Sequence, residues 1–150
     1  MPRRALLTGW LLLQGMLLAG AAATAAAPAL SVQDAWIRQP PPGIDVAAAY
    51  FTLRNTGTRP LTVVAIRTRI ARTAMLHETI QSGGMERMRM HEPLVIGPGE
   101  TVALRPRGLH VMLEGLTAPL APGQSVPLEL VLADGRSIGV SAQVRPLLGP

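Results

Sequence analysis

The chain has 150 residues, of which 48% are hydrophobic and 15% are charged. This composition is too apolar for a disordered protein, and the length suffices for one domain with its own core. All fourteen basic residues are arginine; with nine carboxylates and few aromatic residues they form no dense basic run, which argues against nucleic-acid binding. Cysteine is absent, which excludes disulfides, thiolate metal ligands and cysteine nucleophiles.

The N-terminus has the three-part pattern of a secretory signal peptide. Two arginines precede an apolar stretch over residues 5–20, and small residues fill positions 21–27. We therefore expect residues 1–27 to be a leader, cleaved at a bond between positions 23 and 27, and residues 28–150 to form one exported domain. An uncleaved membrane anchor is the alternative, although the apolar stretch is short and interrupted by polar residues.

Beyond the leader, short apolar segments alternate with turn residues, which is typical of an all-β domain. Prolines and glycines follow one another too closely for long helices. In chain order, the predicted strands cover residues 47–54, 61–67, 94–96, 101–105, 109–113, 126–133 and 136–144. Asp134-Gly135 predicts a two-residue hairpin between the last two. Six to eight short strands at this spacing predict a Greek-key β-sandwich.

Histidine and methionine are concentrated in one part of this predicted sandwich. All three histidines, and all five methionines beyond the leader, lie between positions 75 and 112. A core that used methionine to fill gaps would scatter it through the sheet. Strict alternation places His110 and Met112 on one face of a predicted strand, and Met88 and Met90 share a face in the same way.

A histidine and a methionine on one strand face, next to a second methionine strand and another histidine, could form a pocket with two nitrogen and two sulfur donors. Such a soft donor set favours Cu(I) over zinc, calcium or magnesium. Thioethers also suit an exported protein, because they cannot form disulfides. Taken singly, each residue has a plainer interpretation: His77 as a surface or capping residue, Met88 as packing and His110 as a hydrogen-bonded core residue.

Four other residues of the cluster are assigned less central roles. Met75 and Met85 are expected to pack or to line the rim of the site. Met90 and His91 are ambiguous, and either could contribute to metal binding.

The spacing His77-x10-Met88-x21-His110-x-Met112 resembles the H(M)x10Mx21HxM signature of the periplasmic copper chaperones called PCu(A)C. The similarity covers nearly the whole mature chain, with further matching segments at 34–38, 48–51, 55–57, 108–116 and 126–128. The resemblance implies a cupredoxin-like sandwich that holds one Cu(I) at His77, Met88, His110 and Met112. Where many relatives continue with Pro-Val, this chain has Met90-His91, and it lacks the His/Met-rich C-terminal tail of some relatives, so we expect one site.

The same resemblance implies a periplasmic chaperone that supplies copper to the CuA domain of cytochrome oxidase alongside a Sco-like thiol protein. We expect a monomer, and not an enzyme. Copper storage or resistance without delivery is the main alternative. A metal-free β-sandwich binding module is another. A blue-copper electron-transfer site would need a cysteine, and two histidines leave too few hard ligands for a hydrolytic zinc enzyme.

Overall fold

The structure is a computed structural model that describes residues 29–91 and 93–148. The expected leader, residues 1–27, lies outside the described residues. Ten strands and no helix are present in the described part of the chain, where no helix is long and apolar enough to cross a membrane. The strands are β1 Leu30–Arg38, β2 Val46–Asn55, β3 Leu61–Arg67, β4 Ala71–Ser82, β5 Met85–Met90, β6 Leu94–Ile96, β7 Thr101–Ala103, β8 Leu109–Leu116, β9 Ser125–Leu132 and β10 Ser137–Arg145.

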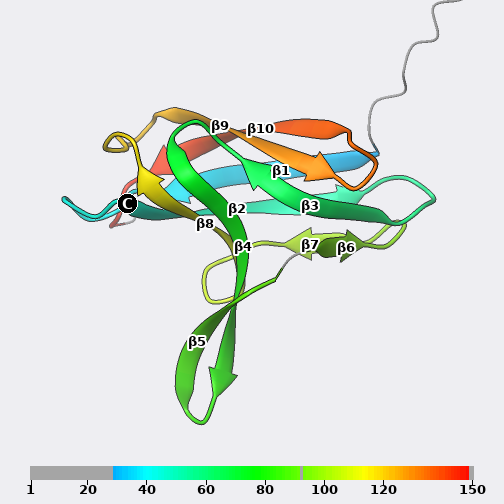
Figure 1. The fold of residues 1–150 in the computed structure, drawn as a ribbon, viewed down its shortest axis with the longest axis horizontal. Coiled ribbons are helices and arrows are strands. Elements are labelled where there is room, and N and C mark those ends of the chain that lie inside the picture. The colour runs from blue at the N-terminus through cyan, green and yellow to red at the C-terminus, as the bar shows by residue number, and fades with distance from the viewer. Residues whose placement is uncertain (1–28, 92, 149–150) are drawn as a thin grey trace, which may run out of the picture.

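All ten strands belong to one hydrogen-bonded sheet. Its order is β5-β4-β8-β2-β1-β10-β9-β3-β6, and β7 pairs with β2 beside this path. The β1–β10 pair is parallel, and the other pairs are antiparallel. The sheet curls over, so that β9 and β10 lie on one side of the domain and β6 and β7 on the other (Figure 1). The prediction of an all-β, cupredoxin-like sandwich is confirmed.

The core lies between the two sides of the curled sheet and follows the alternation of each strand. In β8, Val111 and Leu113 are fully buried. In β9, the inward residues are Val126, Leu128 and Leu130. Full burial of one such side chain contributes about 1.5–3 kcal/mol, so a few strands of this kind stabilise the domain. The opposite face of β8, which carries His110 and Met112, is therefore free for another role.

The predicted and observed strands agree over most of the domain. The expected segments 61–67 and 94–96 match β3 and β6, and the other predicted strands differ at their ends by one to three residues. Three strands lie outside the predicted segments, β1, β4 and β5, although Met88 and Met90 of β5 were expected to share one face. The turn after β9 is wider than the expected two-residue hairpin: Leu132 N–H donates to the carbonyl of Arg136, and Gly135 takes the positive φ of +85° that ends such a three-residue loop.

A β-bulge interrupts β1. Gln33 pairs with Thr52 and Trp36 with Tyr50, so two residues of β1 lie opposite a single residue of β2. Asp34, one of those two, has a φ of +52°, which a short polar side chain tolerates better than a branched one. Beyond the bulge Ile37 is fully buried. Trp36 therefore emerges on the outer face of the sheet.

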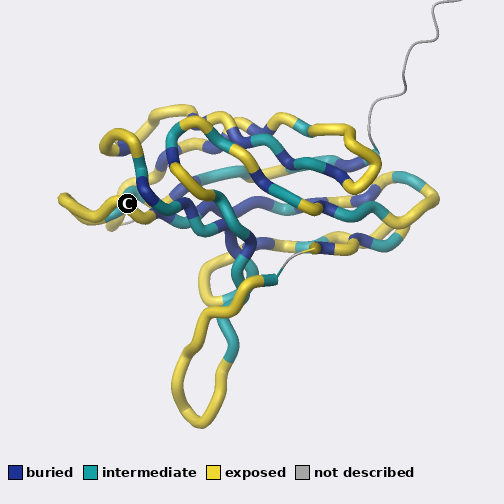
Figure 2. Tube along the Cα trace, in the orientation of Figure 1, coloured by how far each residue is buried: buried dark blue, intermediate teal, exposed yellow. Residues whose placement is uncertain are grey.

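The strands β4 and β5 form a long hairpin that projects from the domain (Figure 1). The first part of β4 pairs with β8, whereas its last six residues pair with β5. Gly83 and Gly84 make the two-residue turn with φ values of +60° and +78°, the combination that a type I′ turn requires. Every residue of β5 is exposed, and Figure 2 shows the outer part of the hairpin as the most exposed extension of the fold.

Candidate metal centre

The register of β5, β4 and β8 determines which side chains share the outer face of the sheet. His77 on β4 lies directly opposite His110 on β8 and Met90 on β5. Residues that oppose each other in antiparallel strands point to the same face. The three side chains therefore form one row across three strands.

Two further pairs extend this row along β4. Met75 lies opposite Met112, and Thr79 lies opposite Met88. Met112 and Met88 are therefore diagonal neighbours of His77, one on each side of it, at the roughly 7–8 Å spacing that a long side chain can cross. The structure thus brings His77, Met88, His110 and Met112 to one face from three strands.

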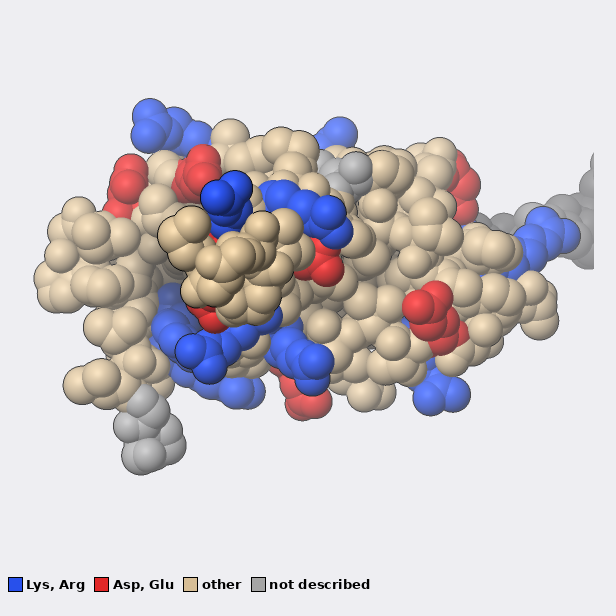
Figure 3. Space-filling model, turned by 90° about the horizontal axis from the view of Figure 1, so that it is seen from below, with Lys and Arg blue, Asp and Glu red and all other residues tan. Residues whose placement is uncertain are grey.

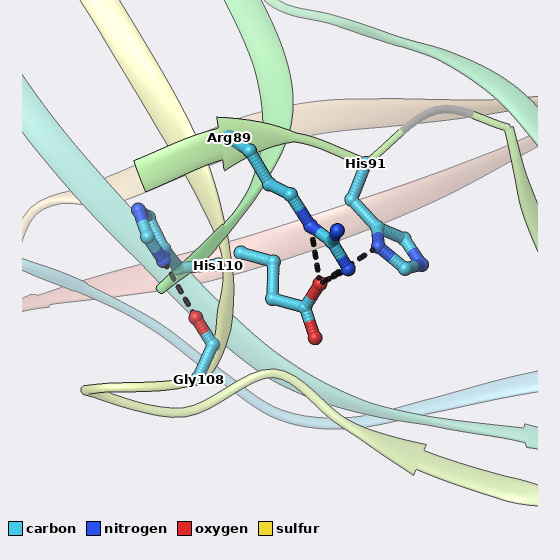
Figure 4. Close-up of polar contacts among 5 residues, drawn as sticks. Arg89, His91, Gly108 and His110 are labelled. Atoms are coloured by element: carbon cyan, nitrogen blue, oxygen red, sulfur yellow. Dashed lines mark hydrogen bonds and ion pairs between the residues drawn. The ribbon is translucent and has the colours of Figure 1, made fainter. Parts of the chain in front are cut away.

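The ring of His110 has a defined orientation and tautomer. The side chain is 4% exposed, and its Nδ1 lies 2.9 Å from the carbonyl oxygen of Gly108 (Figure 4). A carbonyl can only accept a hydrogen bond, so Nδ1 carries the proton and Nε2 carries the lone pair. Metal-binding histidines are commonly held in this way by a backbone carbonyl on the other nitrogen.

Both histidines keep one nitrogen buried and without a partner. These atoms are Nε2 of His110 and Nδ1 of His77, and the two rings meet edge to face with centroids 6.1 Å apart. A buried polar atom without a hydrogen bond costs free energy, about 1–3 kcal/mol for a typical group. A metal ion that accepts the lone pair of this nitrogen removes that cost. Cu(I), which also binds thioethers, is such an ion. The donor set therefore fits copper(I).

Of the two ambiguous residues, only Met90 lies on the face of the histidine row. His91 faces the other side, where its Nδ1 lies 3.3 Å from Oε2 of Glu78 (Figure 4). The same oxygen accepts hydrogen bonds of 3.0 and 2.8 Å from Arg89. The hydrogen bond from Arg89 is the main cause that lowers the pKa of Glu78, with smaller contributions from the charges of Arg89 and His91. Glu78, Arg89 and His91 thus form an ion-pair cluster on the back of the hairpin.

Met75 and Met85, which were expected at the rim or in packing, separate in the structure. Met75 is half-buried on the site face, opposite Met112. Met85 is 58% exposed and pairs with Ser82, one step out of phase with Met88 and Met90, so it lies on the back of the hairpin. Met75 therefore lines the rim, and Met85 is remote from the site.

An aromatic row that the sequence analysis did not assign continues from His110 across the sheet. The ring of Tyr50 lies 6.5 Å from that of His110 and 4.5 Å from that of Trp36. Arg145 and Arg38 stack on Trp36, with their Cζ atoms 4.8 and 5.8 Å from the ring centroid. Burial raises the pKa of the Tyr50 hydroxyl, and the charge of Arg38 partly opposes this. The row covers the side of His110 that faces away from His77.

The site is open on the side of Met112 and has a basic surround. A shallow groove of about 180 Å³ adjoins Met112 and is also lined by Ala48 and Arg38. Viewed from below, arginine side chains lie around the base of the projecting hairpin, with acidic side chains between some of them (Figure 3). A partner can therefore approach the thioethers across a surface that carries several arginines.

Comparisons with known proteins agree with this architecture. A model of the family described as "Putative lipoprotein LpqE-like" matches residues 30–144. The chain belongs to this LpqE-like family. A relative from Leifsonia xyli subsp. xyli, named "Putative lipoprotein Lxx21020", is 34% identical to the LpqE-like chain over 124 residues, which are 82% of this chain and 74% of the relative.

Solved structures place the LpqE-like chain among PCuAC domains. The solution structure of CuI-DR1885 from Deinococcus radiodurans is 39% identical, with a TM-score of 0.65 and 83% of each chain covered. The copper-bound PCuAC domain from PmoF2 has a TM-score of 0.68 and covers 84% of this chain and 97% of that domain; at 20% identity it shows the fold alone. The resemblance to PCu(A)C proteins is confirmed at the level of family and fold.

Proposed function

We propose that this LpqE-like protein is an exported copper(I) chaperone that carries one Cu(I) with His77, Met88, His110 and Met112. The observation that supports it most is the pair of buried, unpartnered imidazole nitrogens on a face that also carries thioethers. The 39% identity to a protein whose structure is titled as its CuI form adds independent support. Two nitrogens and two sulfurs form a donor set that is soft enough to prefer Cu(I).

Each ligand has a distinct task in this proposal. His110 offers Nε2 from a ring fixed by the Gly108 carbonyl, and His77 offers Nδ1. Met112 contributes a thioether from the half-buried rim. Met88, which is 61% exposed on an edge strand, is the ligand that an acceptor can displace first. Copper remains Cu(I), because the transfer replaces one ligand by another and moves no electron to or from the metal.

The exposure of Met88 favours delivery of copper over storage of copper. A storage site gains from complete burial of its metal, whereas an exposed ligand on an edge strand gives an acceptor direct access. The acceptors we propose are the CuA domain of cytochrome oxidase and a Sco-like thiol protein in the periplasm. The basic surround of the site suits an acceptor with an acidic rim (Figure 3).

A Cu(I) titration against a competing chelator, with the histidine and methionine variants, tests the site. We expect a stoichiometry of one, loss of binding in His110→Ala, and no change in Met85→Leu, because Met85 is as exposed as Met88 but lies on the other face. X-ray absorption of the copper-loaded protein should show two nitrogen and two sulfur neighbours. Unchanged affinity in His110→Ala would exclude the proposed site.

A transfer assay separates delivery from storage. The copper-loaded protein is mixed with an apo CuA domain or with a Sco-like protein, and the copper content of each is measured after separation. Transfer that slows as salt is raised would support an acidic acceptor. Retention of copper in the presence of both acceptors would favour storage. Fractionation of cells that express the full chain tests the proposed export.

A further inference from the structure

The strand β5 carries two thioethers on the site face, and the proposed ligand set uses one of them. Met88 and Met90 are each 61% exposed, so neither contributes to the hydrophobic core. A single exposed apolar side chain is ordinary, but these two thioethers lie together on the face that carries the histidines. Packing thus explains neither residue.

The register favours Met90 over Met88 as the closer neighbour of His77. Met90 lies directly opposite His77, whereas Met88 lies opposite Thr79, one pair further toward the hairpin tip. Directly opposed residues have Cβ atoms about 4.5–5.5 Å apart, and diagonal residues are about 7–8 Å apart. This register places the Cβ atom of Met90 nearer to His77 than the Cβ atom of Met88.

Among the described residues, the charged groups of the hairpin nearest to Met90 lie on its other face. Polar and charged groups of the hairpin near it, Glu78, Arg89 and His91, engage one another on the back face. Met90 is also the last residue of β5, next to the point where the hairpin rejoins the domain and His91 N–H donates to the Leu76 carbonyl. This hydrogen bond fixes the backbone beside Met90 against β4.

We propose that Met90 is a copper(I)-binding residue of this site, and that Met88 and Met90 alternate as the thioether that β5 supplies. The inference rests on the proposed copper function. In the exchange, the bond from copper to one sulfur breaks as the bond to the other forms, while His77, His110 and Met112 keep their bonds and copper stays Cu(I). The exchange moves the ion between an inner position at Met90 and an outer position at Met88, from which an acceptor takes it.

Methionine-methyl NMR with Ag(I) tests the proposal directly. Ag(I) has the same charge and closed shell as Cu(I) and does not change its oxidation state, so the methyl signals stay sharp. The protein is labelled with ¹³C at the methionine methyl groups, and the signals are assigned with single Met→Leu variants. We expect the signals of Met88, Met90 and Met112 to shift on addition of one equivalent of Ag(I), and that of Met85 to stay in place.

The outcomes separate this proposal from the function on which it rests. Shifts of Met88 and Met112 with an unmoved Met90 signal would overturn the role of Met90 and leave the copper site intact. If no methionine responds to Ag(I), the proposed function fails, and the role of Met90 fails with it. A shift of Met90 without one of Met88 supports the role of Met90 and replaces Met88 in the ligand set.

Affinity measurements give a second, independent readout. Cu(I) affinity should fall about tenfold in Met90→Leu, at the lower end of what the loss of a group that supports a metal site costs. The double variant Met88→Leu/Met90→Leu should lose more than the product of the two single losses, because each thioether compensates for the other. Met85→Leu is the matched control. A double variant no weaker than Met88→Leu alone would contradict the proposal; circular dichroism checks that each variant is folded.

Discussion

At the scale of single residues, the site depends on two imidazoles that the fold fixes before any metal arrives. The Gly108 carbonyl sets the proton of His110 on Nδ1, and burial keeps solvent from Nε2. An unpaired buried nitrogen destabilises the metal-free protein, and other interactions of the fold offset that free-energy cost. Binding of a metal removes that cost, so the same atoms that weaken the empty protein strengthen the loaded one.

The two ionisable clusters predict separate pH effects. Copper affinity should fall in acid, because a protonated imidazole cannot coordinate. Glu78 has a lowered pKa in the folded state, owing first to the hydrogen bond from Arg89. Its contribution is therefore present above its unfolded pKa and is lost only as the pH falls through the lowered folded value.

Acid should thus weaken copper binding and loosen the hairpin through different groups, the imidazoles and Glu78. Chelator competition as a function of pH measures the first event, and the methyl signals of Met88 and Met90 in the metal-free protein measure the second. In Glu78→Gln the second transition should weaken and the first should remain. The second should not vanish, because Glu86, which pairs with Gln81 and Arg107, still titrates in the hairpin. Equal changes of both events in Glu78→Gln would contradict this separation.

A second residue-scale prediction concerns Asn55, a fully buried polar residue at the end of β2. Its amide donates to the carbonyls of Arg59 and Ile96 at 2.7 and 3.0 Å, and its oxygen accepts from the N–H of Gly57 at 3.0 Å. Asn55→Ala should lower the free energy of unfolding by about 2–3 kcal/mol, because it leaves buried groups unpaired. Urea denaturation measures this; Gln39→Ala, which removes one hydrogen bond of 3.4 Å, should have a much smaller effect.

At the scale of elements, the hairpin of β4 and β5 is the part of the fold whose geometry matters most for the proposed chemistry. Its two-residue turn sets the pairing of Ser82 with Met85, and therefore of His77 with Met90 five residues further along each strand. A turn longer by one residue would move Met88 and Met90 to the back face. Turn length is thus a determinant of the site.

The turn glycines offer a test of this dependence. A side chain at Gly84 would meet nothing within 4 Å, so only the positive φ of +78° opposes substitution. Gly84→Val should destabilise the hairpin locally by about 1–2 kcal/mol, whereas Gly84→Asn should be tolerated, since asparagine adopts this conformation. Hydrogen exchange of the β5 amides should rise in the valine variant with little change in global unfolding. Equal exchange in both variants would show that backbone strain at the turn is unimportant.

The sequence predicts some elements of the site well and others poorly, for physical reasons. Strict alternation in β8 was sufficient to place His110 and Met112 on one face. β4 was missed because its first half packs on the core and its second half leaves it, so no single apolar pattern runs along it. The Gly83-Gly84 pair was a hairpin signal that, counted outward, gives the pairing of His77 with Met90.

Other features have no signal in a strand pattern. The carbonyl that orients His110 belongs to Gly108, in the turn before β8, and any residue has a carbonyl. Only the register of β5 on β4 shows that Met90 lies on the site face while His91 lies on the back face. The face of Trp36 depends on the bulge in β1, because alternation counted from Leu30 would place this residue inside.

At the scale of the whole molecule, the empty site and the stability of the domain are linked. A ligand that binds only the folded state stabilises it by about 2.7 kcal/mol when its free concentration is 100 times the dissociation constant. Thermal unfolding of the protein with buffered Cu(I) should therefore occur several degrees higher than without metal. His110→Ala should show no such shift, and Met85→Leu should show the full one. A shift that survives in His110→Ala would place the copper elsewhere.

The bulge in β1 has a consequence for which changes this chain can accommodate. The strand sends Leu30 inward before the extra residue and Ile37 inward after it, although the two positions have opposite parity. Deletion of one of the two bulge residues would give the two positions the same parity and leave a regular strand, in which Leu30 and Ile37 still point inward and Trp36 still lies opposite Tyr50. The bulge therefore lets β1 lose one residue without turning its side chains to the other face, and the loss would change only the local bend and twist of the strand.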